Sequence, residues 1–279
     1  MKTSKVFHKI LSDINSSAIE VSPRAKKVRE LINYTSSIEN PLNLSFDYES
    51  RKFSWKYLAA ELIWYLSWDL SVDKIWEYAQ LWKQIADDEG TINSNYWFIV
   101  FKRWIKDYEN QYKFILETLI KDKDSRQAVM RYNSHEHIYK WNTDMVCTLS
   151  NQLLIRDNKI NIIINMRSQD IFYWRQFDIV RFWLLLQSFR LDLIDTYPDL
   201  KLWKIYHNAG SIHFYENMFE TAEKVINEEP IKDYLIVLNK SLLEIYNEMK
   251  FNSTLYRDKL KKAETNKKFI QDNLYIDIL

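Results

Sequence analysis

Residues 142–178 read NTDMVCTLSNQLLIRDNKINIIINMRSQDIFYWRQFD and contain the only cysteine of the chain, Cys147. Apolar side chains at positions 160, 162, 164 and 166 alternate with side chains at 161, 163, 165 and 167, which is the period of a β-strand with one apolar face. A polar turn at 156–159 precedes this strand, and residues 147–155 form a second one. The stretch therefore predicts a β-hairpin in which Arg167 points away from the apolar face.

A thiol, a guanidinium and three carboxylates are spaced along this hairpin and the turn after it: Cys147, Arg167, Asp144, Asp170 and Asp178. A lone cysteine is more often an inert buried thiol than a nucleophile, because free cysteine is among the most buried residue types. Neighbouring arginines favour the nucleophile, since a cation lowers the pKa of a thiol toward the reactive thiolate. The set suits covalent chemistry on a small phosphorylated substrate.

The composition excludes several classes of protein. The 279 residues are 47% hydrophobic and carry a net charge of +1, which gives no global field for a nucleic acid polymer or a membrane surface. No apolar run approaches the roughly 20 residues that span a bilayer, and the first residues do not resemble a signal peptide. One cysteine fits a reducing compartment, so we expect a soluble cytoplasmic protein. His135 and His137 lack further ligands at zinc spacing, so we expect no metal.

The chain has only two glycines, Gly90 and Gly210, and eleven tryptophans. Two glycines supply neither a Walker nor a Rossmann motif. They also leave few positions where the backbone can adopt a left-handed conformation without steric strain. We therefore expect turns made from Asn, Asp and Ser, or turns with strained backbone.

The periodicity predicts a single α+β domain over residues 1–279. We expect an irregular first fifty residues with turns at Ser22-Pro23-Arg24 and Asn40-Pro41. The basic run at 25–29 is either a solvated helix start or, with Arg24, a phosphate contact. The remaining predictions are helices at 53–66, 72–85, 107–121 and 177–194, strands at 128–132 and 202–207, a turn at 209–211, a helix at 213–227, and two helices after Pro230.

Glu61 lies within or beside the apolar stripe of the helix at 53–66. A carboxylate there either reaches water at the helix edge or is a buried acid with a raised pKa. The pattern alone favours the helix edge.

At these residues the chain resembles the thymidylate synthase and pyrimidine nucleotide hydroxymethylase family, over residues 22–221, whereas residues 230–279 diverge. The family's order is kept by Glu61 in ELIWYLS, Trp82 with Tyr96, Asp124-Ser125-Arg126, Cys147, Arg167-Ser168-Gln169-Asp170, Asp178 and His213-x-Tyr215. The resemblance implies a large twisted mixed sheet packed with helices and a homodimer that meets sheet to sheet. It also implies methylenetetrahydrofolate as the cofactor.

The resemblance also implies a role for each matched residue. Cys147 is similar to the nucleophile that adds to C6 of a pyrimidine, and Glu61 to a general acid and base acting through ordered water. The remaining implied contacts are Arg24, Arg167 and Ser168 on phosphate, Arg126 on the partner's phosphate, His213 and Tyr215 on the sugar, and Trp82 and Asp170 on folate. Trp174 lies in the loop over the pyrimidine and folate, where family members often have glycine, as they do at Trp68 and Trp97.

The expected substrate depends on the residue at position 178, which is Asp178. Methylating synthases specific for deoxyuridylate usually have asparagine at this position, and an ionised carboxylate only accepts hydrogen bonds. It suits the 4-amino group of cytosine and a protonated N3. The chain therefore resembles the deoxycytidylate 5-hydroxymethyltransferases, as does Thr148 after the cysteine. Cytidylate hydroxymethylation, thymidylate synthesis and a non-catalytic nucleotide-binding relative remain as alternatives.

Overall fold

The predicted hairpin lies inside a six-stranded sheet. In the computed structural model, which describes residues 2–39, 42–249 and 252–279, the strands of this sheet run in the order β1-β2-β7-β6-β5-β4. Their bounds are β1 (Ile19–Val21), β2 (Val28–Ile38), β4 (Val129–Arg131), β5 (Thr148–Arg156), β6 (Lys159–Asp170) and β7 (Lys201–Tyr215). The pair β6 and β7 is parallel and the other pairs are antiparallel.

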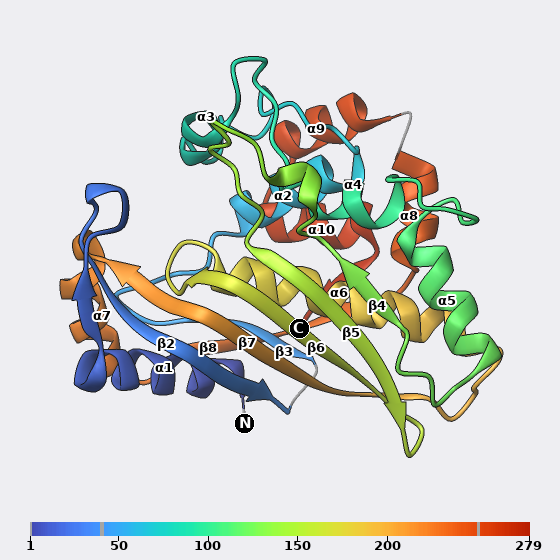
Figure 1. Ribbon diagram of the computed structural model, residues 1–279, viewed down its shortest axis with the longest axis horizontal. Helices are drawn as coiled ribbons and strands as arrows, with labels where there is room; N and C mark the ends of the chain where they lie inside the picture. Colours follow the sequence, from blue (N-terminus) through green and yellow to red (C-terminus); the bar gives the residue numbers. More distant parts are fainter. Residues whose placement is uncertain (1, 40–41, 250–251) are drawn as a thin grey trace.

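The long helix α6 (Arg175–Leu193) makes the crossover between the two parallel strands. Sixteen of its nineteen residues are buried, because it contacts β6 and β7 on one side and β3 and β8 on the other. The smaller sheet consists of β3 (Asn43–Asp47), β8 (Lys232–Leu238) and β9 (Ile276–Ile278), in the order β3-β8-β9. Figure 1 shows α6 behind the large sheet. The helix that follows the end of β6 is therefore held on both sides.

Helix α2 (Trp55–Leu66) is the second buried element that positions the site. Ser54 caps it by accepting from the backbone N–H of Tyr57, and ten of its twelve residues are buried. It packs against α4, α8, α9 and α10. The other helices are α1 (Thr3–Ser17), η1 (Pro23–Ala25), α3 (Leu81–Ile85), α4 (Tyr96–Phe101), α5 (Gln111–Lys121), η2 (His135–His137), η3 (Glu216–Met218), α7 (Phe219–Ile226), α8 (Leu242–Met249), α9 (Ser253–Lys262) and α10 (Asn266–Leu274).

The structure confirms an α+β fold, the hairpin, and the helices predicted at 53–66 and 177–194 within two residues at each end. The prediction of irregular structure in the first fifty residues is wrong. Helix α1 buries Val6, Phe7, Ile10, Leu11 and Ile14 at helical spacing, and β2 and β3 follow it. The basic run at 25–29 leads into β2 and does not begin a helix. The turn at Ser22-Pro23-Arg24 is present as η1, whereas Asn40-Pro41 lies outside the described residues.

Two further predictions are wrong near residue 210. Residues 209–211 are not a turn and 213–227 is not one helix, because β7 continues to Tyr215. A Cβ at Gly210 would lie 2.9 Å from the carbonyl oxygen of Arg167, so the glycine permits the two strands to approach. The segment at 72–85 forms turns before α3, and residues 107–110 precede α5. The last fifty residues contain β8 and β9 as well as helices.

Non-glycine residues adopt the left-handed backbone conformation that glycine usually supplies, as expected. Among the described residues, positive φ angles occur at Asn33, Asp107, Asp157 and Asn158, which tolerate them, and also at Arg24, Ala25, Trp68, Trp141 and Tyr275. At Trp68 a tryptophan adopts the backbone that glycine favours, with φ of 54°. The resemblance implied that glycine is frequent at this position in the family, and the left-handed backbone of Trp68 is compatible with that expectation.

Candidate active site

Cys147 lies immediately before β5, on the segment held by Arg167 of β6. The backbone N–H of Arg167 donates to the carbonyl oxygen of Cys147 at 2.9 Å. The guanidinium reaches across to the same segment, where Nε donates to the carbonyl of Val146 at 3.2 Å and Nη2 donates to that of Met145. Arg167 is exposed whereas Met166 is buried, so the predicted orientation of Arg167 is confirmed. The guanidinium that stands beside the thiol also fixes the backbone that carries it.

The thiol is less acidic than the neighbouring arginines alone would make it. Burial raises the pKa of Cys147 above its ordinary value, Arg167 and Arg24 lower it, and Asp144 raises it. The arginines lower the pKa as expected, but the net pKa is raised because burial outweighs them. Asp144 is itself held firmly, accepting from the backbone N–H groups of Asn93 and Ser94 at 2.7 and 2.8 Å.

Arg24, His213 and Tyr215 meet on the same side of the site. Arg24 is exposed on η1 with φ of 52°, and its side chain reaches Tyr215 at the end of β7. A non-glycine residue in this backbone region costs about 1–3 kcal/mol, so the turn is strained where it presents the guanidinium. The rings of His213 and Tyr215 lie edge to face, 5.5 Å apart. Burial lowers the pKa of His213 to about 4, which keeps the imidazole neutral at pH 7.

Ser168 and Arg126 occupy different surroundings. Ser168 is half-buried on β6 and pairs with Ser211 of β7, next to Arg167. Arg126 is exposed in the turn before β4, and its carbonyl oxygen accepts from Gln152. The structure of one chain therefore brings Ser168 into the cluster and leaves Arg126 on the surface.

Glu61 is fully buried, so the prediction that it reaches water at the helix edge is wrong. Its Oε1 accepts from the hydroxyl of Tyr57 at 2.7 Å and from Arg181 at 3.3 Å. Burial raises the pKa of Glu61, although Arg181 lowers it. Its Oε2 is also buried and has no hydrogen-bond partner among the described residues. A buried carboxyl with one free oxygen is suited to holding or transferring a proton.

Asp178 is buried in the first turn of α6, with both carboxylate oxygens engaged. Oδ2 accepts from the side-chain amide of Gln169 at 2.7 Å, and Oδ1 forms an ion pair with Arg181 one turn along the helix. Arg181 was not among the sequence-based site residues. The pair Asp178 and Arg181 has the i, i+3 spacing of helix neighbours, but this spacing alone does not distinguish a buried pair from a solvated one.

The expected folate residues form an aromatic wall beside this network. The indole N–H of Trp82 donates to the hydroxyl of Tyr57 at 3.0 Å, and the ring of Trp174 lies 5.1 Å from that of Trp82. Burial raises the pKa of Asp170 to about 7, against hydrogen bonds from the N–H groups of Phe172 and Tyr173. Its Oδ2 is buried without a partner among the described residues. A folate pterin carries N–H donors that match this oxygen, so Asp170 fits the cofactor.

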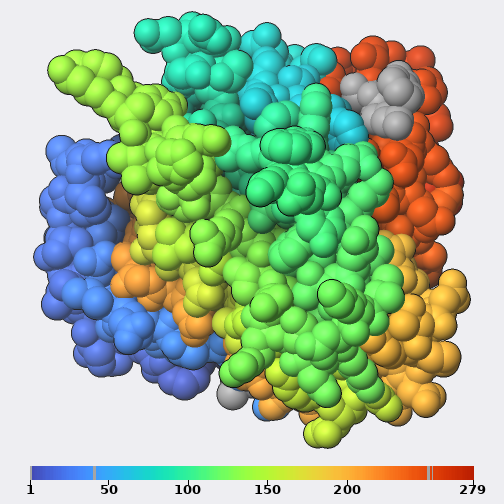
Figure 2. Space-filling view, turned by 45° about the vertical axis from the view of Figure 1, so that its right-hand side comes forward, coloured from blue at the N-terminus to red at the C-terminus, as the bar shows by residue number. Residues whose placement is uncertain are grey.

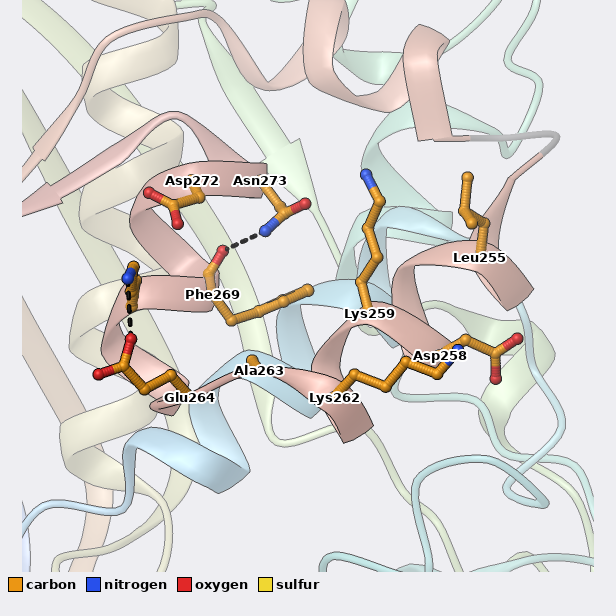
Figure 3. A pocket seen from close by; sticks show the side chains of 10 residues that line it. Leu255, Asp258, Lys259, Lys262, Ala263, Glu264, Phe269, Asp272 and Asn273 are labelled. Carbon is orange, nitrogen blue, oxygen red and sulfur yellow. Dashed lines mark hydrogen bonds and ion pairs between the residues drawn. The ribbon is translucent and has the colours of Figure 1, made fainter.

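An exposed segment precedes the thiol in the chain, and the molecule has a hollow elsewhere on its surface. The segment around residues 135–145 projects from the surface in Figure 2, and it exposes Ile138 and Trp141 to 70% and 83%. A separate open hollow of about 370 Å³ lies between α9 and α10 (Figure 3). Its lining is mixed in charge, with Asp258, Lys262 and Lys268 among its residues, and it contains none of the predicted site residues.

Helices within the described residues are each too short or too polar to cross a membrane.

Comparisons with known proteins agree with this arrangement. The family model described as thymidylate synthase matches residues 6–261, which extends beyond the 22–221 expected. Deoxycytidylate 5-hydroxymethyltransferase of Enterobacteria phage T4 is 35% identical over 194 residues, which are 64% of this chain and 76% of that protein. The enzyme of the same name from phage T2 is 35% identical over 171 residues, 59% of this chain and 68% of that protein. Thermostable thymidylate synthase A from Bacillus subtilis superposes with a TM-score of 0.67 at 16% identity, covering 86% of this chain and 89% of that one.

The family model and the named relatives define a folate-dependent one-carbon transferase, an enzyme class whose one-carbon donor is methylenetetrahydrofolate. The chain belongs to the thymidylate synthase family. The predicted resemblance, the enzyme class and the cofactor are thereby confirmed.

Proposed function

We propose that this enzyme hydroxymethylates C5 of deoxycytidylate, with Cys147 as the nucleophile that adds to C6. The observation that carries the proposal is the buried carboxylate of Asp178, which accepts from Gln169 and pairs with Arg181. An acceptor at the base-reading position matches the 4-amino group of cytosine, a donor, better than the O4 of uracil, an acceptor. The similarity to phage enzymes named for deoxycytidylate supports the same substrate.

The positively charged side of the site is suited to the phosphate. Arg24 and Arg167 supply guanidinium groups beside the thiol, and Ser168 adds a hydroxyl. Neutral His213 and Tyr215 present hydrogen-bonding groups next to Arg24, where the sugar hydroxyl would lie. These contacts orient C6 of the pyrimidine toward the Cys147 sulfur.

The reaction needs a proton donor and acceptor as well as a nucleophile. Addition of the Cys147 thiolate to C6 makes C5 nucleophilic, and loss of the C5 proton later allows the Cys147–C6 bond to break. Glu61 is placed to exchange protons, because its Oε2 is free and its pKa is raised by burial. Methylenetetrahydrofolate supplies the one-carbon unit when bound, and Asp170, Trp82 and Trp174 are the residues that would hold it. Addition of water to the transferred carbon gives the hydroxymethyl group, whereas hydride transfer would give methyl.

Release of C5 tritium from labelled nucleotide into water tests the proposal. The assay runs over dCMP, CMP, dUMP and UMP, with and without methylenetetrahydrofolate, and the mass of the product separates hydroxymethyl from methyl. We expect the fastest folate-dependent release from dCMP, and none from the Cys147→Ala variant. Preference for CMP or dUMP would select one of those two alternatives, and absence of release from all four nucleotides would leave a non-catalytic nucleotide-binding protein.

We also propose that two copies associate through the large sheet. Its strands carry partly exposed large apolar side chains, among them Ile32, Leu149, Trp203 and Tyr206. Apolar groups of this size on a sheet face favour coverage by another surface. Arg126 is exposed, as expected if it reaches the phosphate of the partner's substrate. Sedimentation velocity at increasing concentration would measure the association.

A further inference from the structure

Arg181 lies at the centre of the buried polar network, although neither the pattern of the sequence nor the family resemblance assigns it a role. Its guanidinium donates to Oε1 of Glu61 and to the hydroxyl of Tyr65, and pairs with Oδ1 of Asp178. It stacks over the rings of Tyr65 and Tyr96, at 4.7 and 5.1 Å from their centroids. Its Nε is buried without a partner among the described residues. One cation therefore bridges the proton-transfer acid and the base-reading acid.

A second set of hydrogen bonds reaches Asp178 from the opposite side with a fixed polarity. Arg175 can only donate, so Nδ1 of His207, 3.1 Å away, is the acceptor. The other ring nitrogen of the neutral His207 then donates to Oε1 of Gln169 at 2.8 Å. This orients the Gln169 amide so that its Nε2 donates to Asp178. Asp178 receives donors from both Gln169 and Arg181, so it serves as an acceptor only.

We propose that Arg181 is a specificity-determining positioning residue, which keeps the Asp178 carboxylate ionised and thereby selects a cytosine ring over a uracil ring. The inference rests on the proposed function. An ionised carboxylate accepts from the 4-amino group of cytosine but repels the O4 of uracil. Without the guanidinium, a buried carboxylate takes up a proton, because burial disfavours the charged form. The resulting carboxylic acid has one donor and one acceptor, which match O4 and N3–H of uracil.

The groups that face Arg181 come from several elements. They are Glu61, Tyr57 and Tyr65 on α2, Tyr96 on α4, Tyr132 after β4, and Asp178 on α6. Glu61 raises the pKa of Arg181 against the effect of burial, and the tyrosines also raise it. The charge of Arg181 reaches the nucleophile as well, since it lowers the pKa of Cys147. Arg181 therefore keeps its positive charge throughout the pH range of a binding experiment.

Nucleotide binding by the full chain tests this role without requiring turnover. Calorimetry gives the dissociation constants of dCMP and dUMP for the wild type, Arg181→Met, Arg181→Gln and Arg181→Lys between pH 5 and 9. We expect Arg181→Met and Arg181→Gln to lower the preference for dCMP over dUMP by about 10-fold or more at pH 6, the size of a lost charge-assisted hydrogen bond. The preference should recover at high pH, where Asp178 ionises again. Arg181→Lys keeps the charge and should keep the preference.

The pair Asp178→Asn and Asp178→Asn/Arg181→Met forms the matched control. The single variant removes one of the two carboxylates that face the buried guanidinium, leaving only Glu61, and should bind both nucleotides poorly. The double variant removes both charges and should favour dUMP at every pH. Arg181→Met and Arg181→Gln could instead weaken the binding of dCMP and dUMP by the same factor at every pH. That result would show that Arg181 is only structural, with the proposed function intact. A wild type that binds neither nucleotide would overturn the proposed function and this role with it.

Discussion

The hydroxyl of Tyr57 donates a 2.7 Å hydrogen bond to Oε1 of Glu61, and both groups are buried. Trp82 donates to the same hydroxyl, so the expected folate wall and the expected general acid share one hydroxyl. Tyr57 has a pKa well above its ordinary value because it is buried next to a carboxylate. It therefore stays a donor and holds one oxygen of Glu61, which leaves Oε2 for a ligand or water.

Replacement of Glu61 by glutamine should slow tritium release far more than it weakens nucleotide binding. Glutamine keeps the shape and a carbonyl acceptor for Tyr57 but cannot transfer a proton, and general acid–base groups contribute about 10²–10⁴-fold. Tyr57→Phe is the control, because it removes the hydrogen bonds to Glu61 and from Trp82 but leaves the carboxyl able to transfer a proton, so it should cost much less. Turnover of Glu61→Gln within a few-fold of wild type would exclude Glu61 as the acid–base group.

The thiol of Cys147 should react with iodoacetamide only at pH values above those typical of an exposed cysteine, because burial raises its pKa. Arg167→Met removes a charge that lowers this pKa, so its profile should move to higher pH. Asp144→Asn removes a charge that raises the pKa and should move the profile to lower pH. Rates of alkylation measured across pH give the midpoint of the pH profile for the wild type and for each variant. Shifts of the same sign in the two variants would contradict the opposite effects assigned to Arg167 and Asp144.

Asp170→Asn should stabilise the protein at pH 8 and not at pH 4. The carboxyl has an ordinary pKa near 3.8 when unfolded and about 7 when folded, so the folded protein holds its proton more tightly. The free energy of unfolding therefore falls by about 1.4 kcal/mol for each pH unit as the pH rises from 4 to 7. Asparagine carries no such cost and still accepts from Phe172 and Tyr173 through its carbonyl. Urea denaturation of both proteins at several pH values measures the difference, and a gap independent of pH would contradict the raised pKa.

The hairpin and α6 were predictable because their periods are local. Alternation over β6 shows its buried face directly in the sequence, and the apolar residues from Phe177 onward recur at helical spacing, although α6 is buried on both sides. The continuation of β7 past Gly210 was not predictable from the sequence. Ala-Gly-Ser has turn propensity, and only the contact with Arg167 explains the glycine. Local signals therefore suffice to predict the existence and type of these two elements.

The electrostatics of the site depend on contacts between residues far apart in the chain. Glu61 looked like a helix-edge acid because its partner Arg181 lies 120 positions away. A buried arginine in a helix cannot be told from a solvated one by spacing alone, since it is the partner that makes burial tolerable. The family resemblance proposed roles for Cys147, Arg24 and Arg167, but it carried no information on a cation at position 181.

Trp174→Ala should raise the KM for methylenetetrahydrofolate by about 2- to 10-fold and leave that for dCMP unchanged. The indole of Trp174 packs edge-on against Trp82 and Tyr57, and aromatic pairs of this kind contribute about 0.5–1.5 kcal/mol. Loss of this wall should weaken the folate site alone, and steady-state kinetics with each substrate varied separates the two constants. Trp82→Phe, which keeps a ring, is the milder control. A lower KM in Trp174→Ala would instead show that the indole obstructs the cofactor.

Mixing the inactive Cys147→Ala variant with Arg126→Ala should restore activity if Arg126 acts across the proposed dimer. A mixed dimer contains one site with an intact Cys147 whose phosphate contact comes from the intact Arg126 of the partner subunit, while its other site lacks both. Tritium release after brief dissociation and reassociation should then exceed the sum of the two parents. The exposed position of Arg126 leads to this expectation. Activity equal to that sum, in a sample shown by sedimentation to contain mixed dimers, would place the function of Arg126 within one subunit.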